Sequence, residues 1–236
     1  MSTNRPPSFF KTVLLVAGKD LRIEWRSREI TATMGFFAVL VVLIFAFAFV
    51  NPAGDALLPP VTAGILWVGL LFSGTIALAR TFDRERDLEA VRALLLSPAP
   101  RAAIYLGKLL GVVALMLLVE AVVTFLAAVF FSADIGRHAA WLVVLLVLGT
   151  VGYGAVGTVI SGALLRAKSR DALIAALLFP LVTPLVMAGV RGTSLLLDPQ
   201  TADLATVVFW TQFLASMDVI FVLLGLWAFE PVVTGE

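Results

Sequence analysis

The sequence contains no cysteine and only one histidine, and just 14% of its 236 residues are charged. Without cysteine the chain has no disulfide, no thiolate nucleophile and no cysteine-based metal site, and one histidine leaves too few ligands for most zinc chemistry. Soluble domains are usually about 25% charged, so an ordinary cytosolic enzyme is excluded. The net charge of +1 also excludes a nucleic-acid binder that works through a broad basic field.

The chain also lacks a phosphate-binding loop of the form G-x-x-x-x-G-K-[ST]. Its two Gly-Lys pairs, Gly18-Lys19 and Gly107-Lys108, are followed by aspartate and leucine where that loop needs a hydroxyl residue. No cluster of nucleophile, base and acid is visible either. We therefore predict no catalytic residue, no metal site and no directly bound cofactor, and any ATP is expected to be hydrolysed by a partner subunit.

Apolar residues, by contrast, make up 61% of the chain. A helix needs about 20 apolar residues to cross a hydrocarbon core of about 30 Å. Six runs approach or exceed that length: 30–50, 61–79, 109–131, 139–165, 172–190 and 205–229. The sequence therefore predicts an all-α polytopic membrane protein with six transmembrane helices.

The basic residues are unevenly divided between the segments that join these runs. Of the 17 Lys and Arg residues, 15 lie before the first run, between the second and third, or between the fourth and fifth. By the positive-inside rule, both termini are expected in the cytoplasm. In residues 1–29 an apolar stripe repeats with helical period and the basic residues lie mostly off it, which predicts an amphipathic helix in the cytoplasmic membrane interface, in contact with lipid. Residues 30–236 would then form the membrane domain.

The most informative hydrophilic segment is the cytoplasmic loop 80–108. Leu88, Val91, Leu94 and Leu95 fall on one face of a short predicted helix within it. An exposed apolar face of this kind marks a protein contact, and the alternative is a helix folded back onto the membrane surface. The residues alone leave both interpretations open.

Several short motifs, in this order and spacing, resemble the CcmB-type haem exporter permease, the membrane subunit of the cytochrome c maturation ABC transporter, which is itself similar to type-2 ABC permeases. The main ones are Lys19-Asp20-Leu21, Arg84-Glu85, Leu88-Glu89, Leu94-Leu95-Leu96-Ser97-Pro98, Phe179-Pro180-Leu181 and Phe229-Glu230-Pro231. The sequence departs from the family at Asp87, where members often have glycine before the Leu-Glu pair.

The resemblance implies a location in a bacterial inner membrane and a CcmA-type ABC ATPase subunit that docks on the loop. CcmC- and CcmD-type membrane proteins would complete a complex that handles haem as its substrate. The residues expected to couple to the ATPase are Arg80, Phe82, Arg84, Glu85, Asp87, Leu88, Glu89, Val91, Leu94 and Leu95. Two alternatives stay open: a type-2 permease for a lipid, drug or polysaccharide, and a non-transporting scaffold through which the ATPase drives release of haem-loaded partners.

Two acidic residues, Glu120 and Asp218, lie near the middle of the third and sixth apolar runs. A carboxylate at the centre of the bilayer costs roughly 2.5–3.5 kcal/mol, so each one needs a partner, a proton or water. The functional interpretation is that one or both face an internal cavity and respond to movement of substrate or subunits. The alternative is a protonated acid hydrogen-bonded to a neighbouring helix.

Small residues and prolines mark the fourth and fifth runs. Thr150, Gly154, Thr158 and Gly162 repeat at every fourth position, which favours close helix packing within the bundle or, alternatively, a homodimer seam. Pro180 and Pro184 each remove a backbone donor, so the fifth helix is expected to kink, either as a hinge or as a static bend. His138 lies beside Trp141 and is interpreted as an interfacial residue and not as a haem ligand.

Overall fold

The structure is a computed structural model that describes residues 8–49, 59–81, 100–131, 133, 135–165, 167, 169–198 and 203–234. Within these ranges the chain forms seven α-helices and one short 3₁₀ helix, η1 (Gly136–His138). The α-helices are α1 (Phe9–Ser27), α2 (Glu29–Phe49), α3 (Pro59–Thr81), α6 (Arg101–Phe131), α7 (Ala139–Ala163), α8 (Arg170–Leu197) and α9 (Leu204–Thr234).

Six of these helices, all except α1, are long and apolar enough to cross a membrane. The all-helical fold and the six predicted spans are therefore confirmed. Two boundaries differ clearly, because α6 begins at Arg101 and not near Leu109, and α8 ends at Leu197 and not near Val190. The last part of the expected loop 80–108 is thus the first two turns of α6, which project beyond the apolar run that marked the span.

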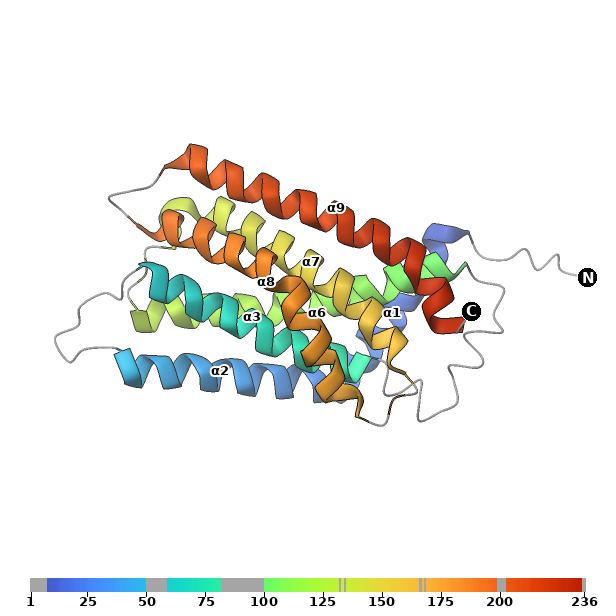
Figure 1. The fold of residues 1–236 in the computed structure, drawn as a ribbon. Helices are drawn as coiled ribbons and strands as arrows, with labels where there is room; N and C mark the ends of the chain where they lie inside the picture. Colours follow the sequence, from blue (N-terminus) through green and yellow to red (C-terminus); the bar gives the residue numbers. More distant parts are fainter. Residues whose placement is uncertain are drawn as a thin grey trace, which may run out of the picture.

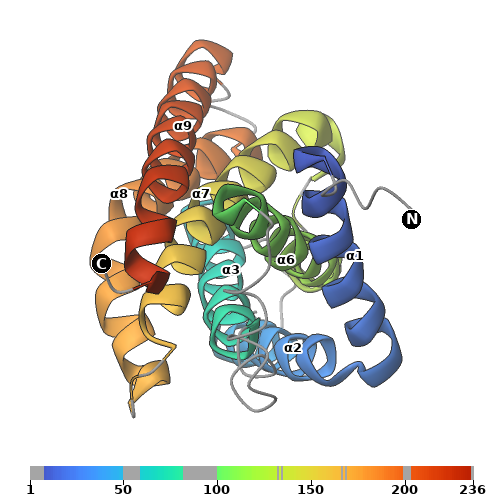
Figure 2. The ribbon, with the colours of Figure 1, turned by 90° about the vertical axis from the view of Figure 1, so that its right-hand side faces the viewer.

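The six spanning helices run side by side, and α1 lies at one end of the bundle together with the C-terminal end of α9 (Figure 1). Figure 2 looks at this end and shows α1 running along the outer side of α6 to the start of α2. The C-terminal ends of α3 and α7 and the N-terminal ends of α6 and α8 lie at the same end, because successive spans alternate in direction.

Helices α3 and α7 form the centre of the bundle. Helix α3 packs against α2, α6, α7 and α8, and α7 packs against α3, α6, α8 and α9. About 61% of the apolar window of α3 is buried, compared with 17% for α9, whose outer face carries large exposed apolar side chains. A movement of α3 would therefore displace side chains that contact four of the other five spanning helices.

The inner helices approach closely because bulky side chains face glycines. The fully buried ring of Trp67 on α3 lies directly against Gly149 of α7 and Gly189 of α8, where a Cβ atom would overlap the ring. Its Nε1–H donates a hydrogen bond of 3.0 Å to the Thr193 hydroxyl on α8. Shape and a buried hydrogen bond together fix the relative position of α3, α7 and α8.

Helix α8 continues through both of its prolines and bends near its middle (Figure 1). Pro180 and Pro184 are exposed on the outer surface, and the Thr183 hydroxyl donates to the Phe179 carbonyl at 2.7 Å. The carbonyls that lose a donor are those of Ala176 and Pro180, four residues before each proline, so the Thr183 bond to Phe179 does not replace them. Whether the bend acts as a hinge stays a prediction.

Candidate functional site

The last turn of α3, residues 78–81, is bound by side chains from four other helices, and we call this arrangement the α3 junction. The Leu78 carbonyl accepts a hydrogen bond of 3.1 Å from the Ser161 hydroxyl of α7 and one of 3.3 Å from Nη2 of Arg170 at the start of α8. Arg170 is 3% exposed, so this contact is shielded from water. Carbonyls at a helix C-terminus lack partners within the helix, which leaves them able to accept such bonds.

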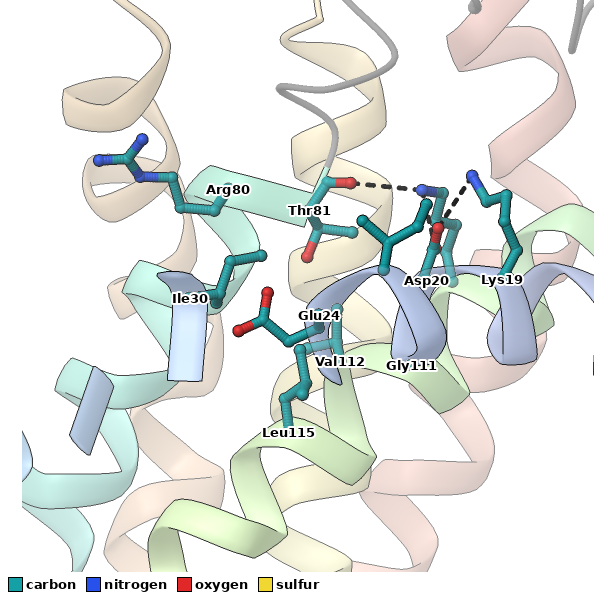
Figure 3. Close-up of a pocket in the computed structure, with 11 residues that line it drawn as sticks. Lys19, Asp20, Glu24, Ile30, Arg80, Thr81, Gly111, Val112 and Leu115 are labelled. Atoms are coloured by element: carbon teal, nitrogen blue, oxygen red, sulfur yellow. Dashed lines mark hydrogen bonds and ion pairs between the residues drawn. The ribbon is translucent and has the colours of Figure 1, made fainter. Parts of the chain in front are cut away.

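Lys108 of α6 joins the α3 junction to α1. Its ammonium group is fully buried and lies 2.9 Å from Oδ2 of Asp20 on α1 and 3.3 Å from the carbonyl oxygen of Thr81 (Figure 3). Lys19 approaches Asp20 from the other side, with Nζ 2.9 Å from Oδ1. One lysine thus holds together the end of α3, the start of α6 and the middle of α1.

Helix α1 is also packed tightly on α6. A Cβ atom on Gly107 would lie 2.6 Å from Cβ of Val16 and 2.9 Å from the backbone carbonyl of Val13, so the two backbones are closer than any other residue type permits. One turn further along α6, a Cβ atom on Gly111 would lie 3.7 Å from Cβ of Asp20, an ordinary contact. Glycine at position 107 is what lets the buried Lys108 reach Asp20.

The connection between α1 and α2 is a tight elbow at Arg28, whose φ of 55° is left-handed. The backbone N–H of Arg28 donates to the Glu24 carbonyl at 2.6 Å and ends α1. Oε1 of Glu24 then accepts from the Thr31 N–H at 2.8 Å, so a buried carboxylate caps the N-terminal turn of α2. Beyond the elbow, Glu29 lies 3.7 Å from Arg80 of α3; both side chains are more than half exposed, so this pair contributes little stability.

The α3 junction encloses too little space for an organic substrate. The cavity between Glu24, Arg80, Thr81 and Lys108 has a volume of only about 40 Å³, enough for one to a few water molecules. Among the described residues, no group of three or more His, Cys, Asp or Glu side chains could hold a metal ion. What the geometry does provide is a set of polar contacts between the end of α3 and the helices around it.

Only one of the predicted coupling residues can be placed in this arrangement. Arg80 is exposed at the end of α3 and pairs with Glu29. The other nine, Phe82, Arg84, Glu85, Asp87, Leu88, Glu89, Val91, Leu94 and Leu95, lie outside the described residues. The described chain leaves α3 at Thr81 and returns at Pro100, immediately before α6.

Glu120 and Asp218 are both buried in the bundle, but the structure does not bring them together. Glu120 accepts a hydrogen bond of 2.6 Å from Thr150 of α7 and borders a cavity of about 570 Å³ between α6 and α7. Asp218 lies against Gly152 of α7 and Leu185 of α8, and neither of its carboxyl oxygens has a hydrogen-bond partner among the described residues. Their roles stay predictions.

The predicted small-residue stripe on α7 faces neighbours within the chain. A Cβ atom on Gly154 would lie 3.0 Å from Cδ1 of Leu109 on α6, and one on Gly162 would lie 3.1 Å from the Phe229 ring on α9. Thr158 between them is fully buried. These contacts lie inside the bundle, and whether a second copy of the chain also approaches α7 stays a prediction.

Sequence reasoning missed most of the α3 junction. Lys108 and Asp20 were each assigned to a hydrophilic segment, and nothing local to either residue indicates that they pair. Likewise, no sequence pattern indicates that Arg170 and Ser161 contact the end of α3. The one available signal was Gly107, because a glycine directly before a lysine at the head of a long apolar run suggests that another backbone packs there.

Comparison with known proteins identifies the family. The family model described as CcmB protein matches residues 11–234. The chain belongs to the CcmB family. The Heme exporter protein B of Pseudomonas aeruginosa is 28% identical over 179 residues, which cover 75% of this chain and 77% of that protein. The Heme exporter protein B of Escherichia coli K12 is 32% identical over 93 residues, which cover 39% of this chain and 41% of that protein.

The CcmB-family match confirms the resemblance drawn from the motifs. It spans nearly the whole chain and includes both α1, from Lys11 onward, and all six spanning helices. Asp20, Lys108 and Arg170 therefore lie within the CcmB region. The chain is a multi-pass membrane protein of a family of transporter membrane subunits, and not of the ATPases that drive such transporters.

Proposed function

We propose that this CcmB-family chain is the membrane subunit of an ABC-type haem exporter complex that serves cytochrome c maturation in a bacterial inner membrane. A CcmA-type ATPase would supply the energy, and CcmC- and CcmD-type membrane proteins would complete the complex. Family membership and two relatives named Heme exporter protein B support the assignment. They also favour haem over a lipid, drug or polysaccharide as the molecule handled.

The observation that best supports coupling between the ATPase and the membrane helices is the hydrogen bond between Lys108 and Thr81. The segment 82–99 connects α3 to α6, and the two ends of this connection are held together by a hydrogen bond from Lys108 to the last carbonyl of α3. An ATPase that grips the segment would therefore act on both helices at once. Through Leu78 the same movement would reach α7 and α8, and through Asp20 it would reach α1.

The proposed orientation places the α3 junction on the cytoplasmic side, and the distribution of basic residues supports it. Residues 1–29 would lie in the cytoplasmic interface, and residues 30–236 would form the permease domain. Two features of α1 support this position. It packs at the outer side of the bundle near one end (Figure 2), and Phe10, Leu14 and Trp25 are exposed on a helix that also carries basic residues. An apolar face of this kind is stable when it rests on lipid.

A gene deletion tests the assignment. Loss of the gene should abolish mature c-type cytochromes while other membrane proteins persist, and the wild-type chain should restore them. Normal cytochrome levels in the deletion strain would overturn the proposal. Haem movement into sealed vesicles that contain the complete complex then tests export itself, because a scaffold that only releases haem-loaded partners would move none.

A pair of leucine variants tests the coupling. Leu95→Asp places a charge on the predicted apolar face of the loop, and Leu96→Asp, the matched control, makes the same change off that face. We expect the ATPase subunit to co-purify with the wild-type chain and with Leu96→Asp, and to be lost with Leu95→Asp. Equal recovery with both variants would show that the leucine face is not the docking surface.

A further inference from the structure

Residues 21–28, the second half of α1 and the elbow, carry three exposed arginines and no exposed acid. Arg22, Arg26 and Arg28 are all exposed, whereas Glu24 between them is only 3% exposed. The residues that the structure describes provide no carboxylate partner to any of the three arginines. We call these three residues the arginine cluster. It is a positive surface that the protein itself does not neutralise.

The first two arginines of the cluster lie on the side of α1 that faces away from the bundle. Val13 is buried and its backbone packs on Gly107 of α6. Arg22 follows Val13 by nine residues, which is two and a half turns at about 3.6 residues per turn, so it emerges on the opposite side. Arg26 lies four residues further, the spacing at which like charges on a helix repel each other. A bound anion would relieve this repulsion.

Arg28 occupies a backbone position that favours glycine. Its φ of 55° is left-handed, and its N–H donates to the Glu24 carbonyl where α1 ends. Helices often end on such a residue, which is usually glycine because a Cβ atom is disfavoured in this conformation. An arginine here costs stability, so its side chain is expected to supply something that glycine cannot. What it supplies is a third exposed positive charge.

The surroundings of the arginine cluster indicate a lipid as its partner. Trp25, within the cluster, is 78% exposed and lines the same cavity between α1 and α6 as Leu118. Leu118 is 50% exposed on a helix long and apolar enough to cross the membrane, so lipid chains reach this place. Tryptophan is enriched at the level of the headgroups. The arginines on either side of Trp25 therefore lie at the level of the lipid phosphates.

We propose that the arginine cluster binds anionic phospholipid, with guanidinium groups on the lipid phosphates and Trp25 at the boundary with the acyl chains. Guanidinium groups bind phosphate through charge-assisted hydrogen bonds. A zwitterionic headgroup brings a positive charge that the cluster repels, whereas a glycerol headgroup leaves the phosphate charge unbalanced. This inference rests on the position of α1 in the cytoplasmic interface, which is part of the proposed function. Because Arg22 follows Asp20 by two residues, a bound lipid also holds the part of α1 that pairs with Lys108.

The test measures which lipid the full-length protein retains. The protein is equilibrated in detergent with equal amounts of phosphatidylglycerol and phosphatidylcholine, and bound lipids are counted by native mass spectrometry. Each basic residue near an anionic lipid surface changes binding by about fivefold. Arg22→Gln and Arg26→Gln should therefore each lower phosphatidylglycerol retention by about fivefold and leave phosphatidylcholine unchanged. The matched control, Arg191→Gln, removes an exposed arginine near the other end of the bundle and should retain as much phosphatidylglycerol as the wild type.

Arg28 allows lipid binding to be separated from stability. Arg28→Gly relieves the left-handed backbone, so it should raise the unfolding temperature in lipid-free detergent, followed by circular dichroism, while it lowers phosphatidylglycerol retention by about fivefold. An arginine that only complements the dipole at the end of α1 predicts the opposite, a lower unfolding temperature and unchanged retention. That result would overturn the proposal.

Three other results would also overturn it. The first is equal retention of the two lipids by the wild-type protein. The second is an equal loss from Arg191→Gln and Arg22→Gln, which would show only a general attraction of charge. The third is displacement of phosphatidylglycerol by a poly-glutamate peptide, which would indicate an acidic protein as the partner. The measurement needs neither ATPase nor haem, so its failure would leave the proposed function standing.

Discussion

The ion pair between Lys108 and Asp20 gives the sharpest quantitative prediction, because its two partners are buried to different degrees. The Lys108 side chain is fully buried, while Asp20 is 22% exposed and also contacts Lys19 at 2.9 Å. Removing one partner of a buried pair typically costs about 3–5 kcal/mol, mostly from the charge left behind. The two single substitutions should therefore have unequal costs.

Asp20→Leu removes the carboxylate that lies 2.9 Å from the buried ammonium and should lower the free energy of unfolding by about 3 kcal/mol. Lys108→Met leaves a carboxylate that keeps Lys19 and some water, so its cost should be about 1–2 kcal/mol. The double variant places two apolar side chains of suitable size together and should be no worse than Lys108→Met. The two substitutions should thus be coupled by about 3 kcal/mol or more.

Reversible unfolding in mixed detergent micelles, followed by circular dichroism, measures all four proteins. Additive effects of the two substitutions would refute the buried pair. A larger loss for Lys108→Met than for Asp20→Leu would refute the assignment of the buried charge to Lys108. ATP hydrolysis by the co-purified ATPase subunit, measured on the same variants, shows whether the contact also contributes to coupling.

Three further predictions concern packing, a buried hydrogen bond and pH. Gly107→Ala should force α1 away from α6 and cost about 1–3 kcal/mol, whereas Gly111→Ala, whose Cβ would meet only Asp20 at 3.7 Å, should be nearly neutral in thermal unfolding. Trp67→Phe should cost about 1–3 kcal/mol by leaving the buried Thr193 hydroxyl without its donor, and the same unfolding assay measures it. The hydroxyl of Thr206, followed by the Ala205 N–H, lowers the pKa of Asp203 at the start of α9. The contribution of ionised Asp203 to the free energy of unfolding should therefore be complete above its ordinary pKa of about 3.9 and be lost as the pH falls below that value. Asp203→Ala should remove this pH dependence of unfolding.

The sequence was sufficient for the spanning helices because a bilayer imposes a length and a composition on each of them. It was less informative about where helices end outside the apolar core, as α6 shows: its first two turns carry Tyr105 and Lys108, both fully buried, ahead of the run that marked the span. Hydropathy measures the transfer of a residue from water to lipid. It does not predict that Tyr105 and Lys108 are buried, because their burial comes from contact with other helices of the protein.

The tight contacts around α7 show a second limit. A four-residue stripe through Gly154 and Gly162 was visible in the sequence, yet the closest approaches in α7 are at Gly149, Gly152 and Gly157, which do not share that spacing. They are set by side chains of α3, α8 and α9 that fill the space opposite each glycine. Local periodicity cannot report the shape of a partner that lies elsewhere in the chain.

The candidate site depends even more on distant partners. Asp20, Thr81 and Lys108 come from three helices, and their meeting follows only from the way α1 packs against α6 beside the end of α3. The family, in contrast, could be recognised from the order of short motifs, because that order survives where individual motifs are weak. The leucine face of the loop stays a prediction, since it lies outside the described residues.

We propose above that a separate ATPase binds the segment between α3 and α6 and moves the membrane domain through the α3 junction. Disulfide crosslinking tests it most directly, with one cysteine introduced at Leu95 of the cysteine-free chain and single cysteines placed over the surface of the partner ATPase. The account predicts a crosslink at Leu95 whose yield changes when ATP is added, and none from a cysteine at the exposed Phe47 of α2. No crosslink at Leu95, or equal crosslinking at Leu95 and Phe47, would contradict it.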